Sequence, residues 1–153
     1  MGESRVVVGL DGCAACQAAL RYAIEEAGRR GCELVVVAAY ERSKFPDSFS
    51  GYEIVPDGDP EVEAEATARY CLQRAGIEFS PDAPLWRILT QDALPVDALS
   101  AAASGACVIV IGRHHGQASD GKPVGSTAAS LLNHSPVPVI SVPPGYQREP
   151  ASQ

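Results

Sequence analysis

Two segments of the chain combine glycines with hydroxyl, imidazole and amino side chains that could hold an anion. One reads Gly112-Arg113-His114-His115-Gly116 and the other Gly121-Lys122-Pro123-Val124-Gly125-Ser126-Thr127. Glycine lets a backbone approach a ligand closely, and Lys122 could reach a phosphate as a mobile cation. The second segment ends where a helix is expected to begin, so free N–H groups and two hydroxyls would face an anion there.

Asp11 belongs to a third segment of this kind, Gly9-Leu10-Asp11-Gly12-Cys13, which directly follows an apolar run. A carboxylate at the end of a strand can accept hydrogen bonds from ribose hydroxyls or hold a metal. Glycines in a loop between a strand and a helix are most often plain turn residues, which is the alternative interpretation. The three segments therefore favour a site for an anionic ligand, but they do not identify that ligand.

Part of a P-loop pattern lies between Gly116 and Lys122. Pro123 occupies the place where a P-loop needs Ser or Thr to bind magnesium. The next helix is expected only from about Gly125, whereas a P-loop helix begins at once. The residues therefore disfavour a P-loop.

Cys13 and Cys16 are spaced as Cys-x-x-Cys between a predicted strand and a predicted helix. That context lowers the pKa of a thiol, so a thioredoxin-like redox pair is one interpretation. The alternation of five strands with helices does not suit that fold. Small buried or capping residues are the favoured interpretation.

His114 and His115 could bind a metal, but no Cys, Asp or Glu stands at a matching offset, so they give only weak support for a metal site. A third histidine, His134, lies near a predicted helix end, where a positive charge is favoured. No Ser, His and Asp follow one another in a strand-turn-helix context. The sequence therefore predicts binding with little or no catalysis.

The composition predicts one globular domain over residues 1–153. The hydrophobic share is 46%, the charged share is 20% and the net charge is −7. These values exclude a wholly disordered chain and, without a Lys/Arg cluster, disfavour a nucleic-acid surface. No run approaches the roughly 20 apolar residues that cross a bilayer, and Met1 to Arg5 is too polar for a secretory signal. Five cysteines, an odd number, fit reduced thiols, so a cytoplasmic protein is expected.

The elements that must position these residues alternate along the chain. Apolar runs predict strands at Arg5 to Leu10, Leu34 to Tyr40, Leu85 to Leu89, Cys107 to Ile111 and Val137 to Val142. Periodicity and capping residues predict helices at Ala14 to Arg30, Asp59 to Gly76, Pro95 to Ser104 and Gly125 to Asn133. Strands that alternate with helices favour a parallel sheet covered on both faces. If the first strand is central, the loops after the first and fourth strands meet at a ligand-binding edge.

Two segments outside these elements attract attention. The stretch from Glu41 to Gly58 holds Pro46, Gly51 and several aromatic residues, and could be a functional lid or a loop lying on its own domain. The end of the chain, Gly145 to Gln153, is expected to fray.

The chain resembles the universal stress protein family from about Ser4 to Pro143. The resemblance rests on Val7-Val8-Gly9-Leu10-Asp11-Gly12, the Gly112 loop, Gly125-Ser126-Thr127 and the closing segment Ser135-Pro136-Val137-Pro138-Val139-Ile140-Ser141-Val142. It implies a five-stranded, doubly wound parallel sheet of order 3-2-1-4-5. The fold would be a three-layer sandwich of the flavodoxin-like, adenine nucleotide alpha hydrolase-like type.

Many members of that family bind ATP, so the resemblance implies ATP or another adenine nucleotide as ligand, with or without Mg²⁺, and at most slow hydrolysis. The implied binding residues are Gly9, Leu10, Asp11, Ala39, Gly112, His115, Gly116, Gly125, Ser126 and Thr127. Among them Asp11 stands at the ribose-side position, and Gly9 and Ala39 at positions that line the adenine.

One position departs from the family pattern Gly-x2-Gly-x9-Gly-Ser/Thr. The second glycine is replaced by His115, and Gly116 comes one place late. The imidazole either crowds the phosphates of ATP or replaces a backbone contact by a side-chain contact. Some relatives bind cyclic AMP and others act as nucleotide-free dimeric modules, and both functions stay open for this chain.

The last predicted strand, Val137 to Val142, contains Pro138, which fits an edge of the sheet. Exposed edges are usually protected. Together with the resemblance, this predicts a homodimer in which the strand pairs with its own copy, and the alternative is a monomer whose edge is blocked by proline.

Overall fold

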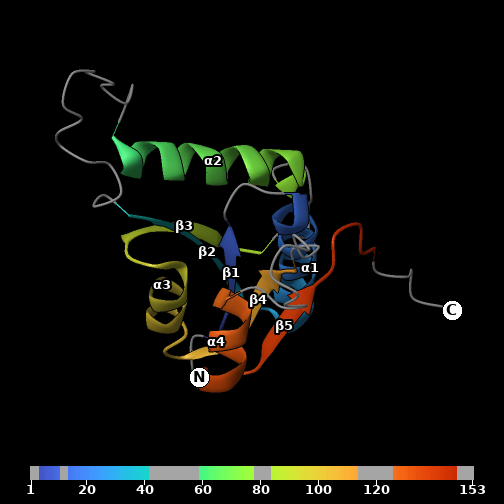
Figure 1. Ribbon diagram of the computed structural model, residues 1–153. Coiled ribbons are helices and arrows are strands. Elements are labelled where there is room, and N and C mark those ends of the chain that lie inside the picture. Colours follow the sequence, from blue (N-terminus) through green and yellow to red (C-terminus); the bar gives the residue numbers. More distant parts are fainter. Residues whose placement is uncertain (1–3, 11–13, 42–58, 78–83, 114–125, 148–153) are drawn as a thin grey trace, which may run out of the picture.

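The structure of the protein is a computed structural model that describes residues 4–10, 14–41, 59–77, 84–113 and 126–147. Its centre is a sheet of five strands, and every pair of neighbours is parallel. The strands are β1 (Arg5–Leu10), β2 (Glu33–Tyr40), β3 (Trp86–Asp92), β4 (Ala106–Gly112) and β5 (Val139–Val142). Their order, β3-β2-β1-β4-β5, confirms the predicted topology (Figure 1).

Four helices alternate with these strands. They are α1 (Ala14–Arg30), α2 (Pro60–Arg74), α3 (Pro95–Ala102) and α4 (Ser126–His134). Two predicted boundaries have clear physical causes. Asp59 caps α2 by accepting a hydrogen bond from the Glu61 backbone N–H at 3.0 Å, and α1 ends before Gly31, whose φ of 66° suits glycine.

The two weaker strand predictions need correction at their ends. β5 begins at Val139 because the backbone N–H of Val137 bonds to the Ser135 hydroxyl in a turn, at 3.2 Å. β3 runs on to Asp92 because it pairs with β2 as far as Tyr40. Both differences arise from hydrogen bonds that an apolar run does not encode. The irregular stretch predicted from Glu41 to Gly58 lies, apart from Glu41, outside the described residues.

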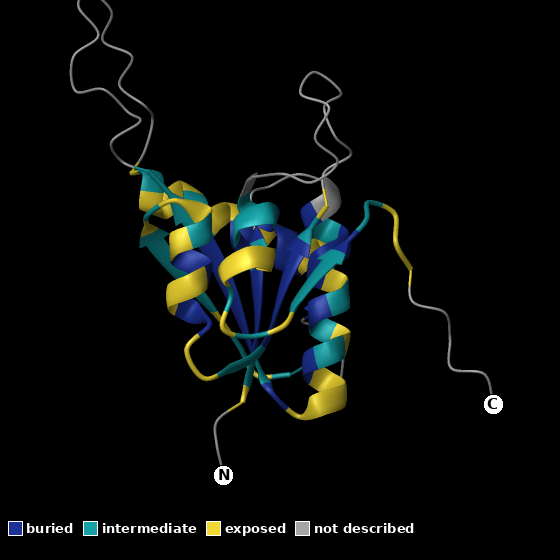
Figure 2. Cartoon of the chain, turned by 60° about the horizontal axis from the view of Figure 1, so that its bottom comes forward, coloured by how far each residue is buried: buried dark blue, intermediate teal, exposed yellow. Residues whose placement is uncertain are grey.

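Each face of the sheet carries its own hydrophobic core. The face that we call the α1/α2 face buries Val6, Val8 and Leu10 of β1 against helices α1 and α2. The opposite α3/α4 face buries Val7 of β1 and Ile109 of β4 against α3 and α4. The central strands are buried on both faces (Figure 2), as continuous apolar runs in a parallel sheet require.

Candidate functional site

The helices that follow β1 and β4 along the chain pack on opposite faces of the sheet. These two strands are parallel neighbours, with Val8 beside Val110. Helix α1, which follows β1, packs on one face, whereas α4, which follows β4, packs on the other. Open α/β sheets bind ligands outside the carboxyl ends of two such strands. We call this place, the carboxyl ends of β1 and β4 with the start of α4, the switch point.

Six of the predicted binding residues fall within the described part of the chain, and all lie at the carboxyl ends of strands or the start of α4. They are Gly9 and Leu10 in β1, Ala39 in β2, Gly112 at the end of β4, and Ser126 and Thr127 in the first turn of α4. The remaining predicted residues, Asp11, His115, Gly116 and Gly125, lie outside the described residues, as does Lys122.

Gly9 has a packing role that the sequence did not reveal. It faces α3, and a Cβ at this position would lie 3.0 Å from Leu99 Cδ1 and 3.1 Å from Leu99 Cδ2. The missing side chain therefore lets Leu99 pack closely on the sheet. Ala39 packs on the same face, so the two positions that the resemblance assigns to adenine share the α3/α4 face.

Leu10 points the other way, into the core of the α1/α2 face, and its side chain is almost completely buried. A ligand at the switch point could contact only its backbone. If Leu10 takes part in binding, it does so through its backbone N–H or carbonyl group and not through its side chain.

The end of β4 is tied to β5. Gly112 pairs with Val142, and the Arg113 backbone N–H donates to the Val142 carbonyl at 2.7 Å. The half-buried Gly112 is thus held at the edge of the sheet, while the Arg113 side chain is exposed. The position of the chain entering the glycine-containing loop is therefore fixed by backbone hydrogen bonds.

The N-termini of α2 and α4 differ in charge. The first turn of α2 carries Glu61 and Glu63 next to the Asp59 cap, so protein carboxylates already occupy its positive end. The first turn of α4 contains no acidic residue. Of these two helix starts, the α4 start is the one whose electrostatics suit an external anion.

The Cys-x-x-Cys interpretation loses support from the burial of one partner. Cys16 is 3% exposed and packs in the core of the α1/α2 face, whereas Cys13 lies outside the described residues. A buried thiol is poorly accessible to an external redox partner. His114 and His115 also lie outside, and the described residues contain no group of three or more His, Cys, Asp or Glu placed to hold a metal.

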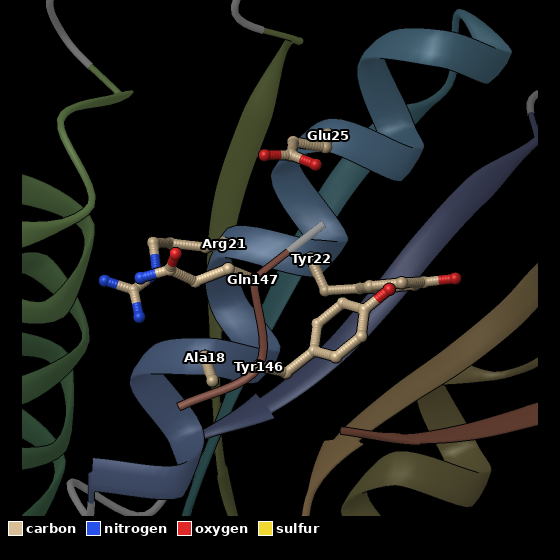
Figure 3. Close-up of a pocket in the computed structure, with 6 residues that line it drawn as sticks. All are labelled: Ala18, Arg21, Tyr22, Glu25, Tyr146 and Gln147. Carbon is tan, nitrogen blue, oxygen red and sulfur yellow. The ribbon is translucent and has the colours of Figure 1, made fainter. Parts of the chain in front are cut away.

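A separate cavity of about 220 Å³ lies between α1 and the segment after β5. Its lining residues, shown in Figure 3, are Ala18, Arg21, Tyr22, Glu25, Tyr146 and Gln147. The rings of Tyr22 and Tyr146 lie against each other with centroids 5.9 Å apart. This contact corrects the expectation that the chain frays from Gly145, and no residue predicted for nucleotide binding lines the cavity.

An open parallel sheet with helices on both faces and a switch point between β1 and β4 defines a doubly wound α/β fold. No helix in the described ranges is long and apolar enough to span a membrane. A model of the universal stress protein family matches residues 3–143, and the chain belongs to that family.

Relatives and solved structures agree with this assignment. Universal stress protein Rv2005c from Mycobacterium tuberculosis is 33% identical over 139 residues, which cover 88% of this chain and 44% of that protein. The chain thus spans less than half the length of the curated relatives it matches.

Two solved structures share the fold. A universal stress protein from Archaeoglobus fulgidus in complex with dAMP has a TM-score of 0.61 at 24% identity, with 93% of this chain and 99% of that chain covered. A universal stress protein in complex with cAMP has a TM-score of 0.66 at 22% identity, with 95% and 100% covered.

Proposed function

We propose that the protein binds an adenine nucleotide at the switch point, with the base beside Gly9 and Ala39 and the phosphate at the start of α4. The observation that carries this proposal is the divergence of α1 and α4 to opposite faces after two neighbouring parallel strands. Adenine nucleotides are the ligands of two proteins that share the fold, one bound to dAMP and one to cAMP.

The phosphate would be held by the first turn of α4. Its backbone N–H groups and, from the sequence, the hydroxyls of Ser126 and Thr127 would be the donors, in a turn that lacks acidic residues. Gly112, Gly116 and Gly125 would let the backbone approach the phosphate, and Asp11 would accept hydrogen bonds from the ribose hydroxyls. This arrangement supplies binding groups and no evident general base, so we propose a binding protein.

Titration calorimetry with ATP, ADP, AMP and cyclic AMP tests the proposal. We expect saturable heat with at least one of the four, and no heat with any of them would overturn it. Asp11→Ala should weaken that binding about tenfold or more, the loss typical of a hydrogen bond to a charged group. Asp92→Ala is the matched control and should leave the affinity unchanged. Asp92 is also an aspartate at the carboxyl end of a strand, but its strand β3 is outermost in the sheet and does not neighbour β1 or β4.

The position of His115 determines which phosphate chain fits. If the imidazole crowds a triphosphate, His115→Gly should strengthen binding of ATP relative to AMP. If the imidazole contacts the phosphates, the same substitution should weaken ATP binding. The ratio of the two affinities, measured on one protein preparation, separates the two roles.

A nucleotide-free interaction module is the competing function, favoured by the position of β5. Among the described strands β5 pairs with β4 alone, so its outer edge is available for a second copy of the chain. We propose a homodimer through the predicted segment Val137 to Val142. Analytical ultracentrifugation should give twice the chain mass of 16.0 kDa. The carbonyls of Pro138 and Val142 accept from β4, so the alternate residue Ser141 directs its backbone N–H to the open edge, and Ser141→Pro should give the monomer by preventing pairing there.

The two proposed functions, nucleotide binding and a nucleotide-free interaction module, are distinguished by whether an adenine nucleotide copurifies with the protein. A module without a nucleotide should release no adenine absorbance on denaturation and should give no heat in the titrations. Dimerisation without any nucleotide binding would favour the module.

A further inference from the structure

Helix α2 carries a row of exposed side chains that faces away from the sheet. Val62, Ala66 and Tyr70 follow one another at intervals of four residues, and all three are exposed. At about 100° per residue, Ala66 lies about 200° around the helix from the buried Ala68, so the row is on the side opposite the core. We call Val62, Ala66 and Tyr70 the outer stripe.

The two large side chains of the outer stripe lie mostly in solvent. The exposed fraction is 62% for Val62 and 58% for Tyr70. In the part of the chain that the structure describes, no other helix carries two exposed large apolar side chains. Valine and tyrosine are weaker helix formers than alanine or leucine, so neither helix propensity nor burial in the core accounts for these two residues.

The Tyr70 ring is held on this surface by the last turn of the helix. Arg74 Cζ lies 5.8 Å from the centre of the ring, which is within the range of a cation–π contact. This contact restricts the ring before any partner binds, and a restricted side chain loses less entropy when it becomes buried. Tyr70 can therefore serve as the main apolar contact of the outer stripe.

Charged side chains are divided between the two halves of α2 and its cap. The acidic residues of the first half and the arginines of the second are Asp59, Glu61, Glu63, Glu65, Arg69 and Arg74. Two of the acids have partners within the same copy: Glu61 accepts from the Thr90 hydroxyl at 3.0 Å, and Glu65 pairs with Arg69 at 2.9 Å. An acidic start and a basic end also suit the dipole of the helix itself, but the dipole does not explain the apolar stripe between them.

Glu63 and Arg74 place opposite charges on one flank of the outer stripe. They are about three turns apart, so both project from the same side of the helix. If two α2 helices lie side by side and antiparallel, Glu63 of each copy is directed toward Arg74 of the other. In a parallel pair the two acidic ends would lie together and repel each other. The charges therefore favour antiparallel association of α2 with a second α2.

We propose that two copies of the chain associate through their α2 helices, packed antiparallel about a twofold axis at Ala66. Val62 and Tyr70 stand at equal distances before and after Ala66, so Val62 of each copy meets Tyr70 of the other. The small Ala66 lets the two helices approach closely at the axis. The contact is self-complementary, as a twofold interface requires, with an apolar pair toward each end and opposite charges on the flank.

This contact is smaller than the interface of a stable dimer. Helix α2 has 15 residues and is about 22 Å long, so it covers roughly a few hundred Å² on each copy, less than the roughly 1,200 Å² of total area in a standard interface. We therefore expect a dissociation constant on the order of 100 μM. At low micromolar concentration the contact adds little to the measured mass, so the strand-paired dimer proposed above can be tested there separately.

The α2 contact is also separate in space from the two sites proposed above. Helix α2 packs over β2 and β3, whereas β5 stands at the other end of the strand order (Figure 1). Gly9 and Ala39, the proposed adenine contacts, lie on the opposite face of the sheet. Association through α2 would double whichever species, monomer or strand-paired dimer, exists at low concentration, so it can fail or hold independently of both proposals.

Sedimentation equilibrium of the full chain over a range of concentrations tests the proposal. Between about 5 and 500 μM we expect the average mass to rise at least about 1.5-fold above its low-concentration value. A mass that stays constant over this range would overturn the proposal.

Two matched variants locate the contact on the helix. Ala66→Arg sets two like charges against each other at the twofold axis and should weaken the association at least tenfold. Thr67→Arg adds the same charge at the next residue, which is exposed and lies about 100° around the helix, and should not weaken it. Arginine is a good helix former, so both variants should keep α2 folded. Undiminished association of Ala66→Arg, or an equal loss in Thr67→Arg, would refute the contact at Ala66.

Cysteine cross-linking tests the antiparallel orientation. A mixture of Val62→Cys and Tyr70→Cys proteins should form a disulfide-linked dimer on mild oxidation, because these positions meet across the axis and a disulfide needs Cα atoms within about 7 Å. Each variant alone should form little of it, and the wild type controls for linkage through the native cysteines. Linkage in each variant alone, with no increase in the mixture, would mean that the helices run parallel and would refute the proposed arrangement.

Discussion

The two faces of the sheet differ in the size of their hydrophobic cores. Among the described residues the core of the α1/α2 face contains 20 buried residues, and that of the α3/α4 face contains 11. The first is covered by helices of 17 and 15 residues, the second by helices of 8 and 9 residues. The α3/α4 face is also the one on which Gly9 and Ala39 lie.

Small side chains line the helices on both faces. On the α1/α2 face the buried alanines of α1 are Ala18, Ala19, Ala23 and Ala27. On the α3/α4 face the buried alanines are Ala98, Ala102, Ala103 and Ala128. The faces therefore differ in the number of buried residues, and we expect the α1/α2 face, which has more of them, to supply the larger share of the hydrophobic stabilisation.

This difference indicates that the two faces contribute unequally to stability and to ligand binding. We call the α3/α4 face, which has the smaller core, the thinner face, and the α1/α2 face the thicker face. The proposed nucleotide site lies on the thinner face and at the N-terminus of its short helix α4, whereas the thicker face contributes more to the stability of the fold. Substitutions on the thicker face should therefore change the free energy of unfolding without changing nucleotide affinity.

The largest expected effect comes from Leu72 in the last turns of α2. Its side chain is 1% exposed in the α1/α2 core, so Leu72→Ala should lower the free energy of unfolding by about 2–5 kcal/mol. Urea denaturation measures this loss. Affinity for the nucleotide that binds the wild type, measured where the variant is fully folded, should stay unchanged; a parallel loss of affinity would break the division between the two faces.

A smaller effect is expected on the thinner face at Gly9. The branched side chain of Gly9→Val would meet Leu99, whose methyl carbons lie 3.0 and 3.1 Å from the position of a Cβ. Overpacking of this kind costs about 1–3 kcal/mol. Nucleotide affinity should fall together with stability, because the adenine is proposed to lie on this face.

Leu99→Ala provides the matched test of that contact. The double variant Gly9→Val with Leu99→Ala should be more stable than the sum of the two single losses predicts, since each substitution relieves the clash or the cavity of the other. Strict additivity in a double-mutant cycle would show that Gly9 is not kept small by Leu99. Recovery of stability without recovery of nucleotide affinity would separate packing from binding at this position.

The cap of α2 should give a still smaller change. Asp59→Ala removes the acceptor for the Glu61 backbone N–H and should cost about 0.5–2 kcal/mol. Asp59→Asn, which keeps a capping oxygen, is the control and should recover most of the loss. Thermal unfolding measures both, and because α2 belongs to the thicker face, neither variant should alter nucleotide affinity.

Much of the fold could be predicted from the sequence because it depends on local patterns. The bounds of α1 and β1, the Pro60 start and Asp59 cap of α2, and the order of elements follow from apolar runs, capping residues and glycine stops. The strand order itself came from the family resemblance, and the register confirms it.

What could not be predicted depends on contacts between distant residues. The packing of Leu99 on Gly9 and of Tyr146 on Tyr22 joins segments whose partners have no local sequence pattern. For the candidate site, the described residues lie at the carboxyl ends of strands and at the start of α4, and all of the binding residues, Asp11 and His115 included, stay predictions.

The smallest expected effect lies at the amino edge of the α3/α4 face. There Arg87 Nε of the edge strand β3 donates to Glu33 Oε1 of β2 at 2.7 Å, with about half of the arginine side chain exposed. Exposed ion pairs contribute about 0.2–1 kcal/mol, so Arg87→Gln should lower stability by no more than that amount. The loss should shrink further in high salt, because salt screens exposed charges. Arg69→Gln, which removes an exposed pair within α2 on the thicker face, is the control and should cost a similarly small amount. If Arg87→Gln lowered the free energy of unfolding by several kcal/mol, exposed ion pairs on the thinner face would contribute strongly to stability. The proposal that stability comes mainly from the thicker face would then be wrong.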